Sequence, residues 1–216
     1  MSAFPRSQAD GFIGDQVAIN SVLEMLRDSK EEAYWPSAVL VLGYISPYDS
    51  TLARVLADFL ESARDFPSCT YNGRYTCRKE TSGLARRGIS TSLSRAKLNV
   101  LLALGDLVRK LPEKAETETA DESCVHPGCS AFHYLVAGLK PSHWAARILW
   151  NERPEYMTKD DRDEDLASMA IKGLGITCRK DAIEMLRQMS KQENISVHLH
   201  EAVAESLTYC SNDSTH

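Results

Sequence analysis

The segment Ala38-Val39-Leu40-Val41-Leu42-Gly43 contains a phrase of small and apolar residues that returns along the chain. The other copies are Leu102-Ala103-Leu104-Gly105, Ala170-Ile171-Lys172-Gly173-Leu174-Gly175 and a weaker one, Ala202-Val203-Ala204-Glu205-Ser206-Leu207. Such internal similarity indicates a repeat protein. A glycine within a helix lowers helix stability by roughly 1 kcal/mol relative to alanine, so we expect close packing to compensate at each glycine of the phrase. We expect its small residues to let the first helix of a pair approach the second closely.

Amphipathic helices are predicted around these copies, because apolar residues recur at positions i, i+3, i+4 and i+7. The regular sets begin at Ile19, Trp35, Leu52, Val100, Phe132, Ala182 and Leu199. Sustained alternation of period two, which is typical of strands, is absent. The sequence therefore predicts an all-α fold that needs no strands.

The segments between these sets have the chemistry of helix ends. Asp49 or Ser50 can cap a helix by accepting its exposed N–H groups, and Pro112 ends another. The acidic run 160–165 puts carboxylates at a helix N-terminus, where the helix dipole favours them. The run lacks the alternating acids and the glycine of a calcium loop, so helix capping is the better interpretation.

The recurring phrase resembles that of HEAT repeats, including the short HEAT-like type of phycobilin lyases and deoxyhypusine hydroxylase. The resemblance implies one domain over residues 1–216, an α-α superhelix of about four helix pairs. Gly43 and Gly105 stand 62 positions apart, and Gly105 and Gly175 stand 70 apart. A two-helix HEAT unit takes about 40–47 residues, so we expect two insertions, at about 65–90 and 111–130.

Charge is distributed unevenly along a chain whose formal net charge is −5. A basic segment, residues 64–97, stands between two acidic ones, and the simplest interpretation is a solvated loop. The alternative is a contact patch for an acidic partner or a phosphate. Its candidate residues are Arg74, Arg78, Lys79, Arg86 and Arg87. The acidic total makes nucleic acid an improbable partner, because binding phosphates needs surplus Lys and Arg.

The six cysteines leave three interpretations open. Cys69 and Cys77 fall in the first insertion, Cys124 and Cys129 flank His126 in the second, and Cys178 and Cys210 stand near predicted helix ends. Free thiols are the favoured interpretation, and disulfides would form if the protein is exported. The insertion pairs and His126 are weak candidates for zinc, because their spacing is wider than C-x2-C. We expect no metal and no cofactor.

Catalytic motifs give little support to an enzyme. His200-Glu201 is similar to the His-Glu phrase with which deoxyhypusine hydroxylase binds two irons. The aligned pairs in the other copies carry neither His nor carboxylate; they are Ser168-Met169, Leu98-Asn99 and Pro36-Ser37. One pair cannot hold two metal ions. The sequence also has no G-x-S-x-G elbow, P-loop or G-x-G-x-x-G motif.

Two tryptophans permit a different enzymatic comparison. HEAT-like folds include alkylpurine DNA glycosylases, and Trp144 and Trp150 with Arg147 between them could be read as part of such a surface. Core tryptophans are the better interpretation. Glu61, Glu152 and Asp165 are conceivable acid–base groups, but nothing in the sequence brings two of them together.

The sequence favours a non-catalytic protein–protein interaction module that binds one partner protein in its groove. A bacterial immunity or adaptor protein is the concrete subtype, and acidic charge would suit a basic partner. The alternatives are an enzyme on a HEAT-like scaffold and a phosphate- or nucleic-acid-binding protein that uses residues 64–97. No apolar run is long enough to cross a membrane, and the first fifteen residues do not resemble a signal peptide, so we expect a cytoplasmic protein.

Overall fold

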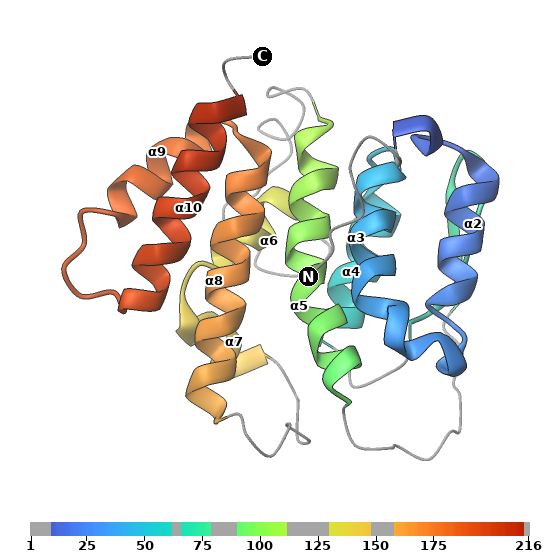
Figure 1. The fold of residues 1–216 in the computed structure, drawn as a ribbon, viewed down its shortest axis with the longest axis horizontal. Helices are drawn as coiled ribbons and strands as arrows, with labels where there is room; N and C mark the ends of the chain where they lie inside the picture. Colours follow the sequence, from blue (N-terminus) through green and yellow to red (C-terminus); the bar gives the residue numbers. More distant parts are fainter. Residues whose placement is uncertain (1–9, 62–65, 79–89, 112–129, 148–157, 214–216) are drawn as a thin grey trace.

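The fold is seen in a computed structural model that describes residues 10–61, 66–78, 90–111, 130–147 and 158–213 (Figure 1). Most of these residues are helical, which confirms the predicted all-α class. The elements are η1 (Asp10–Phe12), α2 (Gln16–Met25), η2 (Ser29–Tyr34), α3 (Trp35–Ile45), α4 (Ser50–Glu61), β1 (Ser68–Tyr71), β2 (Tyr75–Arg78), α5 (Thr91–Arg109), α6 (Ala131–Ala137), α7 (Pro141–Arg147), α8 (Lys159–Thr177), α9 (Lys180–Met189) and α10 (Val197–Asp213).

The predicted helix boundaries are confirmed at two positions. The Asp49 carboxylate accepts hydrogen bonds from the N–H groups of Thr51 and Leu52, so Asp49 caps α4. The acidic run begins α8, where Thr158 and Asp161 form a reciprocal capping box. The carboxylates at this end therefore cap a helix, as the sequence predicted.

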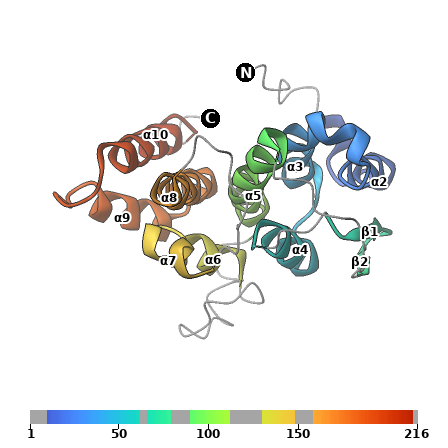
Figure 2. The same ribbon diagram turned by 90° about the horizontal axis from the view of Figure 1, so that it is seen from below.

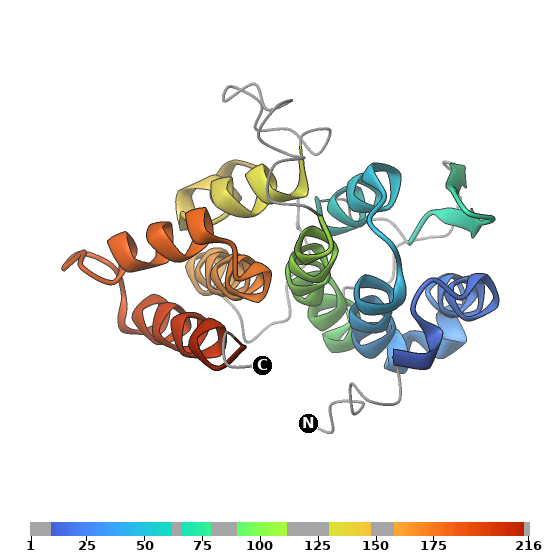
Figure 3. The same cartoon turned by 90° about the horizontal axis from the view of Figure 1, so that it is seen from above.

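The helices form two layers (Figures 2 and 3). One layer contains α2, α3, α5, α8 and α10 in chain order, and each of these helices packs on the next. The other layer contains the β1–β2 hairpin, α4, α6 with α7, and α9. The apolar core fills the space between the layers and runs from Ile19 in α2 to Val203 in α10. The four helices with the recurring phrase all belong to the first layer.

The glycines of the recurring phrase lie where neighbouring first-layer helices cross. A Cβ atom on Gly43 would stand 2.6 Å from Ala103 of α5, and one on Gly105 would collide with the backbone of Gly173 in α8. A Cβ on Gly175 would stand 2.5 Å from Ser206 of α10. The expectation that the phrase packs the two helices of one pair is therefore wrong. Its small residues bring successive first-layer helices together instead.

Two lysines, one within α5 and one at its C-cap, bind the carboxyl ends of earlier helices. Lys97 is fully buried, and its Nζ donates to the carbonyl oxygens of Phe59 and Leu60 at the end of α4. Lys110 Nζ donates to Gly43, Tyr44 and Ser46 at the end of α3, at 2.5–2.6 Å. Burial lowers the pKa of Lys110 to about 8, against the attraction of Asp106, so the amine is still charged at neutral pH. Cations at these positions complement the negative ends of helix dipoles.

The first insertion contradicts the expectation that the fold needs no strands. Residues 68–78 form an antiparallel hairpin that packs on α2 through β1 and on α4 through β2. It occupies the second layer beside α4, at the end of the molecule where α2 lies (Figure 2). The hairpin lies in the second layer, where the other elements are the helices α4, α6, α7 and α9.

Candidate functional site

The hairpin is our candidate site, and its two faces differ in chemistry. The register pairs Cys69 with Cys77 and Tyr71 with Tyr75, and these side chains face the helices. Thr70 pairs with Thr76 on the opposite face. Because successive side chains of a strand point to opposite faces, one face is available to pack on the helices and the other to face the surroundings.

A disulfide between Cys69 and Cys77 closes the hairpin. The Asn72 N–H donates to Arg74 across the turn, so the alternating ladder places Cys69 and Cys77 at a non-hydrogen-bonded pair, where strands approach most closely. Their Cα atoms are 4.1 Å apart. Gly73 has φ of +85° at the tip, a conformation that glycine adopts at no steric cost. The turn and the disulfide together fix the hairpin with few residues.

Side chains of α2 bind the outer edge of β1. The Asn20 carboxamide donates to the Tyr71 carbonyl at 2.8 Å and accepts from the Tyr71 N–H at 2.7 Å. Gln16 donates to the same carbonyl at 2.9 Å. An open strand edge is normally available to pair with another chain, so these amides protect this one.

The Tyr75 side chain attaches the hairpin to the end of α3. Its hydroxyl donates to Ser46 Oγ at 2.5 Å, and both residues are buried. Burial raises the pKa of the Tyr75 hydroxyl well above its ordinary value, while the bond to Ser46 opposes the shift. Tyr75 therefore stays neutral and acts as a donor. Its ring packs at 4.7 Å from that of Tyr71, within the core.

The outward face of the hairpin carries hydroxyls and cations. Thr70 and Thr76 are exposed, and their hydroxyls share a hydrogen bond of 2.8 Å. Arg74 at the turn and Arg78 at the end of β2 are exposed as well. Neither arginine forms an ion pair with any described residue. Residues 66–78 contain no acid, so every charged side chain in this segment is a cation.

The remaining members of the predicted basic patch, Lys79, Arg86 and Arg87, fall outside the described residues, as do Cys124, His126 and Cys129. For Cys69 and Cys77 the structure contradicts both the free-thiol and the zinc interpretation, because the two sulfurs are bonded to each other. Cys178 and Cys210 form a second disulfide. A cytoplasmic location remains a prediction, and the two disulfides argue against it, since such bonds persist in oxidising compartments.

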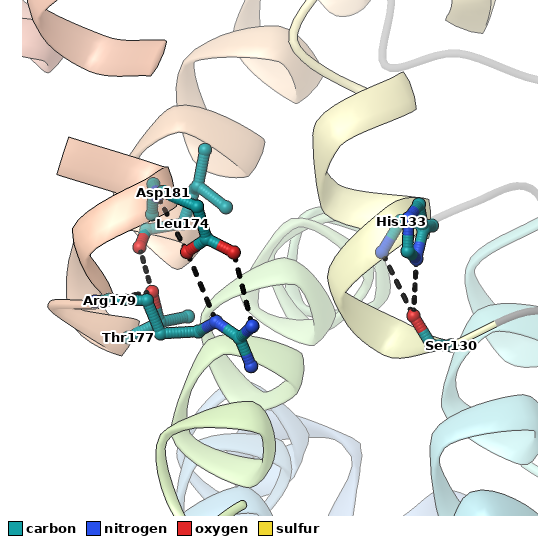
Figure 4. Close-up of polar contacts among 7 residues, drawn as sticks. Ser130, His133, Leu174, Thr177, Arg179 and Asp181 are labelled. Carbon is teal, nitrogen blue, oxygen red and sulfur yellow. Dashed lines mark hydrogen bonds and ion pairs between the residues drawn. The ribbon is translucent and has the colours of Figure 1, made fainter. Parts of the chain in front are cut away.

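The second disulfide joins the turn between α8 and α9 to α10. In the same turn, the buried Arg179 is held by several contacts (Figure 4). Arg179 Nε and an Nη donate to the two carboxylate oxygens of Asp181 at 3.2 and 3.1 Å. The guanidinium also lies 4.5 Å from the centre of the Phe132 ring in α6. Thr177 donates to the Leu174 carbonyl and so closes the end of α8. This cluster joins the α8–α9 pair to α6.

Figure 4 also shows Ser130 and His133 at the start of α6. Ser130 Oγ lies 2.7 Å from His133 Nδ1 and accepts from the His133 N–H, which makes Ser130 the cap of this helix. A serine beside a histidine suggests nucleophilic catalysis, but here the serine oxygen is engaged in capping. The pair is a helix start.

The other residues singled out from the sequence have mostly structural surroundings. Trp144 is fully buried and donates to the Gly138 carbonyl, which confirms it as a core residue. Glu61 accepts from the Tyr134 hydroxyl, and Asp165 lies 3.4 Å from His198. Burial raises the pKa of Asp165, while His198 lowers it. Glu152 and Trp150 fall outside the described residues.

The His200-Glu201 phrase lies in α10, with His200 half-buried and Glu201 exposed. Over residues 10–61, 66–78, 90–111, 130–147 and 158–213, no three His, Cys, Asp or Glu side chains gather closely enough to hold a metal ion. In the same part of the chain, no helix has the length and apolar character required to cross a membrane.

The sequence contained a signal for the hairpin that the search for sustained alternation missed. Asn72-Gly73-Arg74 stands between Cys-Thr-Tyr and Tyr-Thr-Cys, and a short connection with Asn-Gly between alternating segments is a strong hairpin signal. Each strand has four residues, too few for a sustained pattern of period two. The Cys178–Cys210 disulfide had no comparable local signal, because 32 positions separate its cysteines.

Comparison of the chain with protein-family models, with curated proteins and with solved structures finds no match. The function must therefore be argued from the surface of the chain itself.

Proposed function

We propose that this chain is a non-catalytic protein-binding scaffold of HEAT type that presents the basic face of its hairpin to an acidic segment of another protein. The order in which first-layer helices pack, each on the next, supports a solenoid. The phrase glycines at successive crossings support it too, since each repeat meets its neighbour in the same way.

One observation carries the proposal: a hairpin fixed at four points presents two arginines that form no ion pair with any described residue. The disulfide, the two α2 amides and the Tyr75–Ser46 bond hold the strands. A surface ordered before binding loses little conformational entropy when a partner arrives. Its position at the first pair also places it at an end of the layers, where a partner has access.

Charge indicates the kind of partner. The total charge of the chain disfavours long polyanions, whereas a short acidic segment needs to meet only the hairpin. Exposed arginines also favour carboxylate or phosphate groups, because the planar guanidinium can donate two parallel hydrogen bonds. A cluster of carboxylates on a protein is compatible with the acidic total charge and with the exposed arginines. Nucleic acid is the competing occupant.

The test is affinity capture from the native host, with three baits compared by quantitative mass spectrometry. The baits are the native chain, the double variant Arg74→Glu/Arg78→Glu, and a matched control, Arg54→Glu/Arg187→Glu, which reverses two exposed arginines on α4 and α9. We expect a stoichiometric protein on the first and third baits and its loss from the second. Equal recovery on all three baits would remove the proposal, and so would a partner lost after nuclease treatment, which would favour nucleic acid.

A further inference from the structure

The connection between α9 and α10 contains an acceptor motif for N-linked oligosaccharide. The motif is Asn194-Ile195-Ser196, which has the form Asn-x-Ser with a middle residue other than proline. Asn194 lies in a turn and is exposed, and so are residues 191–193 before it. A motif this short also occurs by chance, so it indicates a modification only where the fold and the compartment agree with it.

The residues after Asn194 hold the turn in place. Ile195 packs partly against the core. The Ser196 hydroxyl accepts from the Leu199 N–H at 3.3 Å and donates to Glu164 of α8, so Ser196 caps α10. The side chain of Asn194 forms no hydrogen bond with any described residue. A bulky hydrophilic group on its amide would therefore extend into water without displacing a contact.

The disulfides indicate the compartment. Cys69–Cys77 and Cys178–Cys210 are both bonded, so none of the cysteines that the structure describes is a free thiol. Such bonds persist in secreted proteins and in the lumen of the secretory pathway, whereas cytosolic thiols stay reduced. An N-linked oligosaccharide is attached to proteins on the same route. The disulfides and the exposed motif thus indicate one environment through different residues.

We propose that Asn194 carries an N-linked oligosaccharide, attached on the secretory route that keeps the disulfides oxidised. The donor is an oligosaccharide linked to a lipid pyrophosphate. The bond between its anomeric carbon and the phosphate oxygen breaks, the same carbon forms a bond to Asn194 Nδ2, and the lipid pyrophosphate leaves with the bonding electrons. The amide gives up one proton, and nothing is oxidised or reduced. This inference is independent of the proposed function.

The contacts of Ser196 indicate when the transfer takes place. The acceptor motif requires a hydroxyl at this position. In the folded chain this hydroxyl is engaged by Glu164 and by the Leu199 N–H. We therefore expect the oligosaccharide to be attached before α10 packs on α8.

An oligosaccharide on Asn194 leaves the hairpin open. The connection between α9 and α10 lies at the left end of the molecule in Figures 1 and 2, and the hairpin lies at the right end in Figure 2. The modification would therefore cover the last helix pair and stay away from Arg74 and Arg78.

A second motif, Asn212-Asp213-Ser214, provides an internal comparison. Its asparagine lies within α10, in a helix and not in a turn, and its serine falls outside the described residues. The structure therefore supports the motif at Asn194 and gives no comparable support to this one.

The test uses the full chain purified from its native host with free thiols alkylated. Peptide N-glycosidase releases the oligosaccharide and converts the modified asparagine to aspartate, which takes up label in water enriched in oxygen-18. We expect treatment to increase the electrophoretic mobility and to place the label at Asn194, as read by mass spectrometry. An unchanged mobility with unlabelled Asn194 would overturn the inference, and so would alkylated thiols at the four described cysteines.

Three variants made in the same host locate the acceptor. Asn194→Gln should abolish the mobility shift, and so should Ser196→Ala. Because Ser196→Ala also removes the cap of α10, Ser196→Thr is its control, which restores a hydroxyl and should restore the shift. Asn212→Gln is the matched asparagine control and should keep the shift. A shift that survives in Asn194→Gln and disappears in Asn212→Gln would assign the oligosaccharide to the end of α10 and overturn the inference.

Discussion

The hairpin and the α8–α9 turn each combine a disulfide with arginine, yet they use the arginine in opposite ways. Arg179 at the turn is 5% exposed and contacts both Asp181 and Phe132. Arg74 and Arg78 on the hairpin are exposed and form no ion pair with a described residue. The same residue type contributes to stability in one region and is available for binding in the other.

Rigidity alone therefore does not identify a binding surface. Both regions are fixed by a disulfide and by hydrogen bonds to neighbouring elements. A binding function is indicated where an ordered segment carries cations that pair with no described residue, as the hairpin does. The following substitutions test whether the two regions differ in this way.

Loss of the Cys178–Cys210 disulfide should have the largest effect on stability. The bond closes a loop of 32 residues, and the entropy of such a loop corresponds to about 3.5–4 kcal/mol of unfolding free energy. Cys178→Ser/Cys210→Ser should lower the urea midpoint accordingly and leave partner capture intact. An unchanged midpoint, or capture lost in a folded variant, would contradict the structural role given to this turn.

Arg179→Met should destabilise the fold by about 3 kcal/mol, because it removes a buried guanidinium together with its ion pair to the partly exposed Asp181 and its contact with Phe132. Arg74→Met is the matched change at an exposed arginine and should shift stability by at most about 0.5 kcal/mol. Urea unfolding of both variants provides the comparison. Similar losses from the two would erase the distinction between the regions.

Loss of the Cys69–Cys77 disulfide should lower stability less than loss of the Cys178–Cys210 disulfide, and it should weaken partner binding more. Its loop spans 8 residues, for which the same entropy argument gives about 2.5 kcal/mol. We expect Cys69→Ser/Cys77→Ser to fold with a lower urea midpoint and to capture less partner, because its hairpin is no longer fixed before binding. Capture at the native level would show that the hairpin need not be rigid.

Asn20→Ala should lower the free energy of unfolding by about 1–1.5 kcal/mol. It removes two hydrogen bonds to Tyr71 and leaves the Tyr71 N–H without the side chain that accepts from it. Ser21→Ala, at the next position of α2, is the control, because the Ser21 side chain is exposed and bonds to its own helix. We expect little change in the control. Amide exchange of Tyr71 should become faster in Asn20→Ala alone, and an unaltered rate would show that α2 does not hold the strand.

Much of the fold could be predicted from the sequence because helical periodicity is a local property. The sets at Ile19, Trp35, Leu52 and Val100 all fall in helices. The sequence identifies the glycines of the recurring phrase. It does not identify the helix that each glycine contacts, because several helices could lie beside it. The recurring phrase predicts close packing at Gly43 and Gly105. It does not predict that Ala103 and Gly173 are the residues that pack there.

The site was predicted less completely. Arg74 and Arg78 were found because a basic segment in an acidic chain is visible in the composition. The contacts that hold the hairpin were missed, because they join distant positions of the chain, such as Asn20 with Tyr71 and Ser46 with Tyr75.

Hydrogen–deuterium exchange of the chain, alone and with the partner captured on the native bait, distinguishes a binding role of the hairpin from one of the α8–α9 turn. We predict that the partner slows exchange in residues 66–78 of the hairpin and in the adjacent start of α2, and leaves the α8–α9 turn around Arg179 unchanged. Protection confined to the α8–α9 turn, with the hairpin unaffected, would contradict the assignment of binding to the hairpin and of stability to the turn.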